Sequence, residues 1–232
     1  MDRAELAERY RRGGCLFLDC DGVVFDANAF KVDALRAVME GTDEAAQREM
    51  LDYWHAHGGL SRYVKLDHFF RNVVGLADEA ELEAAVARGL EVFGAASRAG
   101  YRTTSPVPEA LTLVRDAGPA RCFVVSGTDQ AELRDVFETQ AIDDLFAGVL
   151  GSPTTKPEHI RRVLAARDAA PDDALFVGDG AGDFRACRET AVPFVYLASM
   201  SGWTGAAEAL DGERDVFWAD DWPTLLDALG VG

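Results

Sequence analysis

The chain has 232 residues, of which 48% are hydrophobic and 27% charged, as is ordinary for a soluble globular protein. Its 40 acidic and 23 basic residues give a formal charge of −17, and no run of clustered lysines and arginines appears. Such a surface repels nucleic-acid backbones and anionic membranes, so we expect neither as a partner, whereas a small anionic ligand held by a few local cations stays possible.

The first residues, MDRAELAERYRRGG, are charged and lack the apolar stretch of a signal peptide. No later window is apolar over the length of a membrane span. The cysteines show no metal-binding spacing and are expected to be buried free thiols, which suits a reducing compartment. We therefore expect a cytoplasmic protein.

Apolar runs that end in polar residues predict the strands of a buried sheet. CLFLD ends at Asp19, CFVVS at Ser126 and ALFVGD at Asp179, and two further runs cover 194–198 and 215–219. Continuous apolar runs are typical of strands covered on both faces. Helical patterns such as PEALTLVRDAG and PEHIRRVLAARDA lie between the later runs. This alternation predicts an α/β fold with a parallel sheet.

The segment 29–98 interrupts the alternation. It contains no convincing strand but four helical patterns, over 29–40, 43–58, 61–75 and 78–97. We therefore predict a discontinuous α/β core, formed by 1–28 and 99–232, that carries a small inserted helical domain.

Polar residues stand where the predicted strands end. Ligands of open parallel sheets bind beyond the carboxyl ends of the strands, so Asp19, Ser126 and Asp179 are expected to converge there. Lys156, in the turn-rich stretch GSPTTKPEH, can reach the same place. A hydroxyl and an ammonium group would hold phosphoryl oxygens.

The carboxylates of this group predict a metal site. Asp19, Asp21, Asp179 and Asp183 would repel one another unless a cation lay among them, and Mg²⁺ is the usual oxygen-bound ion beside a phosphate. Asp19 is the candidate nucleophile, because aspartate takes up phosphoryl groups covalently. Asp21, brought around by a turn at Gly22, is the candidate acid and base.

Each of these residues also has a simpler explanation. An aspartate before glycine at a strand end could simply form a turn, Ser126 could cap a helix, Lys156 could be solvated, and Asp183 could be a first-turn helix residue favoured by the dipole. Together, however, four ordered motifs at strand ends favour a site.

The motifs resemble those of the haloacid dehalogenase superfamily. FLDCDGVVFD is similar to its first motif, VVSGTD to its second, TKPE to its third and GDGAGD to its fourth, in the family's order over 14–30 and 100–200. The resemblance implies a Rossmann-like core with a helical cap between the first and second motifs. It also implies roles for the matching residues: Asp19 as nucleophile, Asp21 as acid and base, and Ser126, Gly127 and Lys156 on the phosphate. Mg²⁺ is expected to be held by Asp19, the Asp21 carbonyl and Asp179, with Asp183 at the last acidic position of the metal site, where a water molecule can mediate its contact.

Asp21 narrows the expected chemistry. Family members that cleave carbon–halogen bonds or phosphonates lack an aspartate at this position. We therefore expect a Mg²⁺-dependent phosphatase that hydrolyses a small phosphomonoester, such as a sugar phosphate, through an aspartyl-phosphate. A phosphomutase stays open as an alternative, as does a catalytically silent phosphate-binding protein. The resemblance permits a monomer or a homodimer.

The inserted domain should select the substrate, because the core contacts only the phosphate. Its stretch HAHGGLSRYVKLDHFF places two cations, Arg62 and Lys65, close together in an otherwise acidic protein. Either could meet a second anionic or hydroxyl-rich part of the substrate. The alternative is that Ser61 caps a helix and both cations are solvated.

Overall fold

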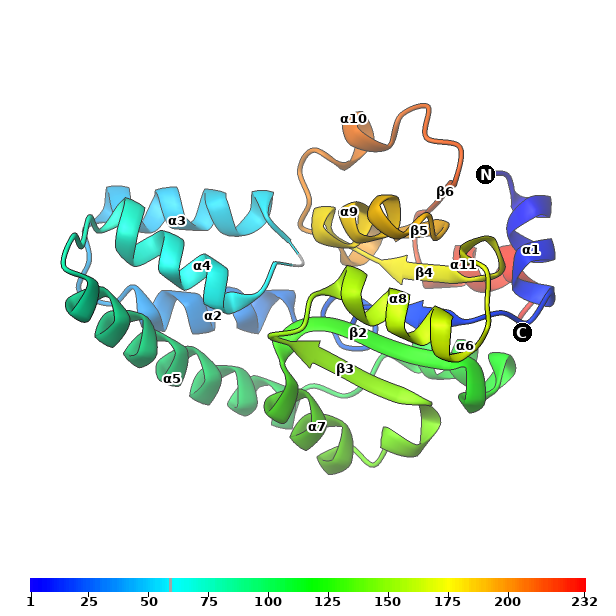
Figure 1. The fold of residues 1–232 in the computed structure, drawn as a ribbon, viewed down its shortest axis with the longest axis horizontal. Coiled ribbons are helices and arrows are strands. Elements are labelled where there is room, and N and C mark those ends of the chain that lie inside the picture. Colours follow the sequence, from blue (N-terminus) through cyan, green and yellow to red (C-terminus); the bar gives the residue numbers. More distant parts are fainter. Residues whose placement is uncertain (59) are drawn as a thin grey trace.

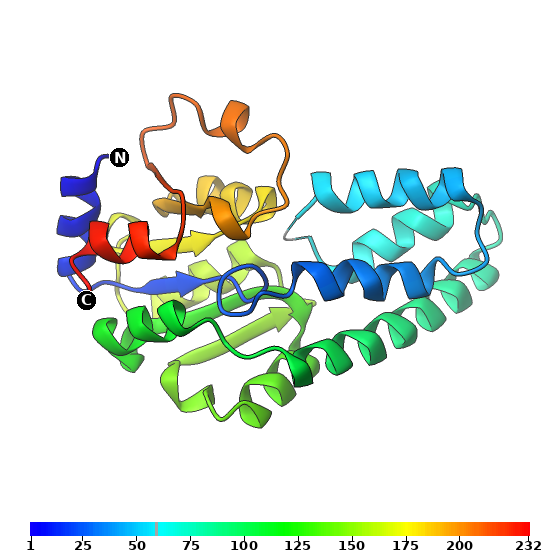
Figure 2. The ribbon, with the colours of Figure 1, turned by 180° about the vertical axis from the view of Figure 1, so that it is seen from behind.

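The computed structural model describes residues 1–58 and 60–232. An α/β core lies at one end of the molecule, and a layer of helices extends from it (Figure 1). Both chain ends lie on the side of the core that faces away from this layer (Figure 2). The strands of the core are β1 (Leu16–Leu18), β2 (Cys122–Asp129), β3 (Gly148–Ser152), β4 (Leu175–Gly178), β5 (Phe194–Leu197) and β6 (Val216–Ala219).

The strands form a six-stranded sheet in the order β3-β2-β1-β4-β5-β6, and every pair is parallel. The expected α/β, Rossmann-like fold is confirmed. The strand order reverses between β1 and β4, which is where ligands bind in such sheets. The third strand, GVLGS, was not predicted, because two glycines in five residues hide its apolar pattern.

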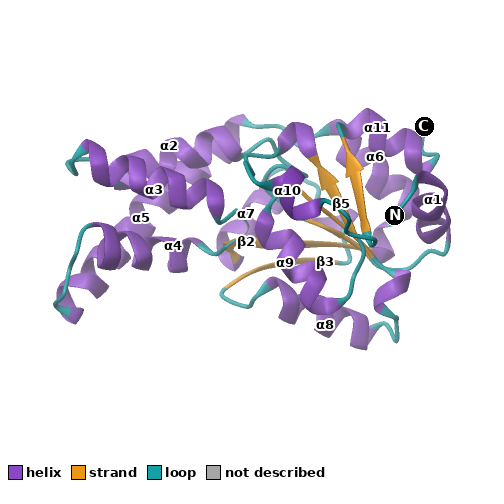
Figure 3. Ribbon diagram, turned by 90° about the horizontal axis from the view of Figure 1, so that it is seen from above, coloured by secondary structure: helices purple, strands orange, loops and turns teal. Residues whose placement is uncertain are grey.

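Helices cover both faces of the sheet (Figure 3). They are α1 (Arg3–Arg11), α6 (Pro108–Ala117), α7 (Gln130–Thr139), α8 (Lys156–Ala166), α9 (Ala181–Thr190), α10 (Ala206–Leu210) and α11 (Trp222–Leu229). Strand side chains alternate between the faces, as the two-residue period of a strand requires. Leu16 and Leu18 pack with residues of α1, α6, α7 and α11, whereas Phe17 packs with residues of α8, α9 and α10.

The predicted insertion forms a layer with its own apolar core, which we call the cap. Its helices are α2 (Asn28–Val38), α3 (Glu44–Ala56), α4 (Arg62–His68) and α5 (Glu79–Thr103), with a π-helical turn over Phe69–Val73. Its centre contains Leu35, Met50, Leu66 and Phe93. The expected helix over 61–75 is therefore divided, and α5 continues beyond residue 98 into the core.

Among the described residues, no helix combines the length and the apolar character needed to cross a bilayer. The four cysteines are buried free thiols, as expected.

Candidate active site

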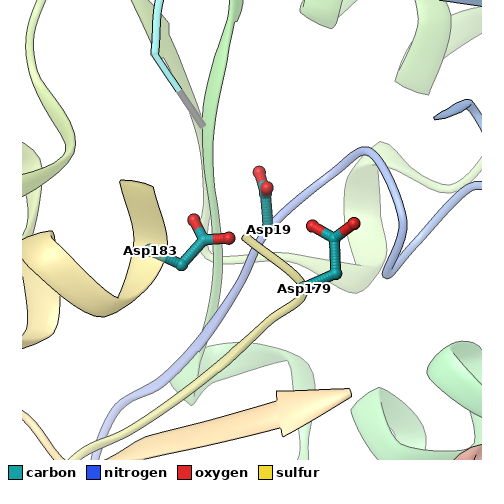
Figure 4. A group of neighbouring side chains, drawn as sticks. All are labelled: Asp19, Asp179 and Asp183. Carbon is teal, nitrogen blue, oxygen red and sulfur yellow. The ribbon is translucent and has the colours of Figure 1, made fainter. Parts of the chain in front are cut away.

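Three acidic side chains meet where the strand order reverses. Asp19 directly follows β1, Asp179 directly follows β4, and Asp183 lies in the first turn of α9. One carboxylate oxygen from each lies within 4.8 Å of the others, and all three residues are buried (Figure 4). The structure thus brings together three of the four acidic residues that the sequence analysis placed at one site.

The turn after Asp21 makes room for this group. Gly22 has φ +75°, and a Cβ atom there would lie 2.2 Å from Asp179 Oδ2. Glycine is therefore required both by the backbone conformation and by the close approach. The same Asp179 oxygen accepts a hydrogen bond from Asn28 Nδ2 at 2.9 Å, which ties the start of the cap to β4.

Lys156 lies among the carboxylates. Its Nζ is 2.8 Å from Asp19 Oδ1 and 2.6 Å from Asp183 Oδ1, and only 5% of its side chain is exposed. Burial disfavours its charge, but Asp183 and Asp19 outweigh burial and raise the pKa of Lys156. The alternative of a solvated lysine is wrong.

The two carboxylate oxygens of Asp183 make different contacts. Its Oδ2 accepts from the Gly180 amide at 3.0 Å, at the start of α9, while its Oδ1 accepts from Lys156. The helix-start alternative and the site prediction are therefore compatible at this residue.

The two oxygens of Asp19 have different surroundings. Oδ1 accepts from Lys156 and, at 2.7 Å, from the Cys20 amide. Within residues 1–58 and 60–232, Oδ2 has no hydrogen-bond donor, and Asp19 lines a cavity. One carboxylate oxygen is thus held in place while the other remains available to a ligand.

The charges of the three carboxylates fit a bound divalent cation. Burial and the neighbouring Asp183 raise the pKa of Asp19 to about 7, and burial with Asp183 and Asp19 raises that of Asp179 well above its usual value. One lysine therefore compensates the three negative charges only in part. A group of buried carboxylate oxygens at this spacing is the type of donor set that Mg²⁺ prefers.

The Asp21 carboxylate is not part of this group and has its own hydrogen-bond donors. Its Oδ2 accepts from Lys31 Nζ at 2.8 Å and from Thr128 Oγ1 at 3.1 Å, and its Oδ1 accepts from the Tyr101 hydroxyl. Burial alone would raise the pKa of Asp21, but Lys31 and the hydrogen bonds from Lys31, Tyr101 and Thr128 lower it. Metal coordination by the Asp21 carbonyl stays a prediction.

The second motif lies beside Asp21. Ser126 is buried in β2, and its Oγ accepts from the Thr128 amide at 3.0 Å. Asp129, not Ser126, caps α7, so the helix-cap alternative for Ser126 is wrong. Gly127 lines the cavity next to Thr128.

The cavity has a volume of about 120 Å³ and lies between the core and the cap. Asp19, Asp21, Asp179 and Gly127 line it from the core. The cap contributes a mixture of aromatic and cationic side chains, namely Trp54, Phe93, Lys31, Arg62 and Lys65.

The two predicted cap cations are buried, so the alternative that they are solvated is wrong. Ser61 does cap α4, where its Oγ accepts from the Tyr63 amide. Arg62 Nη1 donates to Glu132 Oε2 in α7 at 2.9 Å, and both side chains are at most 5% exposed. Lys65 Nζ instead lies 3.8 Å from the centroid of the Trp54 ring.

Two contacts of Asp21 were not predicted. Lys31 and Tyr101 lie in helices at the two crossings between core and cap, and both donate to Asp21. Lys31 is 10 positions and Tyr101 80 positions away in the chain. The sequence does contain a signal for Lys31, which lies on the apolar face of a helical pattern. A lysine at such a position needs a partner, because unpaired lysines are seldom buried.

Comparisons with known proteins agree with this geometry. The family model of haloacid dehalogenase-like hydrolases matches residues 14–189. The comparison with curated proteins finds no match.

Solved structures share the fold. A haloacid dehalogenase-like family hydrolase from Streptococcus pneumoniae aligns with a TM-score of 0.68 at 19% identity, over 92% of this chain and 97% of its own. A hydrolase from Pseudomonas syringae aligns with a TM-score of 0.70 at 18% identity, over 94% and 98%. A protein described as a predicted phosphoglycolate phosphatase from Haemophilus somnus aligns with a TM-score of 0.67 at 16% identity, over 92% and 96%.

The family match spans the three carboxylates, Lys156 and the inserted cap, and so it covers both walls of the cavity. This chain belongs to the haloacid dehalogenase-like hydrolase family.

Proposed function

We propose that the protein is a Mg²⁺-dependent phosphatase that hydrolyses a small phosphomonoester through a phosphoryl group carried on Asp19. The observation that carries this proposal is the unequal environment of the two Asp19 oxygens. Lys156 and the Cys20 amide hold Oδ1, whereas Oδ2 has no donor among the described residues and belongs to a residue that lines the cavity.

Asp19, Asp179 and Asp183 would hold the cation, with the Asp21 carbonyl as the further predicted ligand. When bound, Mg²⁺ would neutralise phosphoryl and carboxylate charge as a Lewis acid. Ser126, Gly127 and Lys156 would orient the phosphoryl oxygens.

In the first half of the reaction, Asp19 Oδ2 attacks phosphorus and the bond from phosphorus to the leaving oxygen breaks. The leaving oxygen takes a proton from Asp21. In the second half, Asp21 removes a proton from water, the water oxygen attacks phosphorus, and the bond to Asp19 breaks to release inorganic phosphate.

The contacts of Asp21 match the base form that the second half needs. For the first half Asp21 must carry a proton when the ester is bound. Lys31, at 2.8 Å from Asp21 Oδ2, positions the carboxylate for both halves. The four buried free thiols fit the reducing cytoplasm that we propose as the location.

The test measures inorganic phosphate released from p-nitrophenyl phosphate and from a panel of phosphorylated sugars and acids, with and without MgCl₂. We expect release that depends on Mg²⁺ and an acid-stable phosphoryl adduct on Asp19 in rapidly quenched samples. Accumulation of a positional isomer without phosphate release would favour the phosphomutase. Complete inactivity across the panel, with Mg²⁺ bound normally, would favour the silent binding protein.

A further inference from the structure

The cap wall of the cavity contains a cation, Lys65, that no carboxylate of residues 1–58 and 60–232 contacts. Lys65 is 3% exposed and lines the cavity. In the part of the chain that the structure describes, no carboxylate and no hydrogen-bond acceptor contacts its Nζ, and its one polar contact is the face of Trp54. Burial, aided by Lys31, lowers the pKa of Lys65 to about 7, which shows how poorly the site compensates the ammonium charge.

A second unused donor lies one helical turn away. Arg62 precedes Lys65 by three positions in α4, so the two side chains lie on the same helix face. Arg62 Nη1 is bonded to Glu132, but Nη2 is buried without a hydrogen-bond partner among the described residues. Arg62 also lines the cavity.

Buried donors without acceptors are costly, and a ligand that supplies an acceptor recovers that cost. The ligand group should be anionic, because Lys65 is cationic and, unlike Arg62, has no carboxylate in contact among the described residues. It must also be compact, because the cavity of about 120 Å³ has to hold the rest of the substrate. A planar carboxylate meets these conditions, since its two oxygens can accept from separate donors.

We propose that Lys65 Nζ, with Arg62 one helical turn away, forms a subsite for a carboxylate on the leaving group, so that the substrate is the phosphate ester of a small hydroxy acid. The inference rests on the phosphatase function proposed above. The cap would then recognise the charge of the leaving group, while the core binds the phosphoryl group that all phosphomonoesters share.

The test compares three esters of one size class: 2-phosphoglycolate, its carboxamide analogue, which lacks only the charge, and 1,2-ethanediol bisphosphate. We expect the wild-type kcat/KM to favour the carboxylate over the carboxamide by about tenfold or more. In Lys65→Met this preference should fall close to one, mainly through KM. Arg71→Gln changes the net charge by the same amount at an exposed cap position and should keep the preference.

Equal kcat/KM values of the wild type for the carboxylate and the carboxamide would overturn the subsite. A preference for the carboxylate that survives in Lys65→Met would also overturn it. A greater kcat/KM for the bisphosphate than for the carboxylate would overturn the choice of a carboxylate.

Binding separates this inference from the proposed function. Dissociation constants of the same three esters are measured calorimetrically with Asp19→Asn in the presence of Mg²⁺, both alone and combined with Lys65→Met. The wild type could hydrolyse none of the three esters and yet bind the carboxylate about tenfold more tightly than the carboxamide, in a manner that depends on Lys65. In that case the phosphatase function fails and the subsite stands. Equal binding of the two esters overturns the subsite.

Discussion

In the core, Lys156 is buried between two carboxylates at 2.8 and 2.6 Å, whereas in the cap Lys65 is buried against Trp54 with no carboxylate in contact among the described residues. Both lysines are buried, but the first has its pKa raised and the second has it lowered. In the core, Lys156 compensates part of the carboxylate charge, and a bound metal ion would compensate the rest. In the cap, the charge of Lys65 is left for a ligand to compensate.

The largest loss of activity is expected from a substitution of Asp19 in the core. Asp19→Asn keeps the shape of the side chain but removes the nucleophilic oxygen, and kcat should fall by at least about 10⁴-fold. Circular dichroism and Tm serve as controls for the fold. Turnover close to that of the wild type would exclude Asp19 as the nucleophile.

Asp21→Asn tests the proton path. We expect kcat for alkyl phosphates to fall by about 10²- to 10⁴-fold, because the leaving oxygen then departs without a proton. p-Nitrophenyl phosphate should lose less, since its leaving group needs little protonation. Equal losses for both esters would contradict the acid role.

Glu132→Gln tests the contact that joins the cap to α7. Arg62 would keep a buried charge without a counter-charge, and the free energy of unfolding should fall by about 3 kcal/mol in urea titrations. The matched control is Glu79→Gln, which breaks the exposed pair with Arg71 and should change the free energy of unfolding far less. Similar values for the two variants would show that burial of the Arg62 pair is unimportant for stability.

The dependence of stability on pH tests the surroundings of Lys65. Its pKa is about 7 in the folded protein against an ordinary 10.5, so between these values the unfolded chain binds more protons and stability rises with pH. Below about pH 7 the full cost of the buried charge is present. Lys65→Met removes that cost, so its Tm should exceed the wild-type Tm at pH 7 and approach it near pH 10. A Tm difference that does not change with pH would contradict the assignment.

The core site could be predicted because its residues follow directly from strand ends. Asp19 and Asp179 come at the ends of apolar runs, and parallel strands bring those ends to one edge of the sheet. The cap contacts could not be predicted, because they depend on how helices pack. Glu132 meets Arg62 across 70 positions of sequence, and nothing in either local pattern indicates the partner.

The same reason explains the partial success in the cap. Four helical patterns predicted four helices within a few residues, yet the π-helical turn after His68 and the continuation of α5 to Thr103 were missed. Both depend on packing between elements rather than on the spacing of apolar residues.

The first turn of α9 has its own connection to the cap. The Gly182 amide donates to the Gly58 carbonyl at 2.7 Å, so a backbone group of the cap satisfies a donor that a helix start otherwise leaves to solvent. No side chain takes part in this hydrogen bond. Exchange of the Gly182 amide proton with deuterium should therefore report on separation of the cap from the core. The exchange should be slow while the cap is docked and fast once the cap moves away.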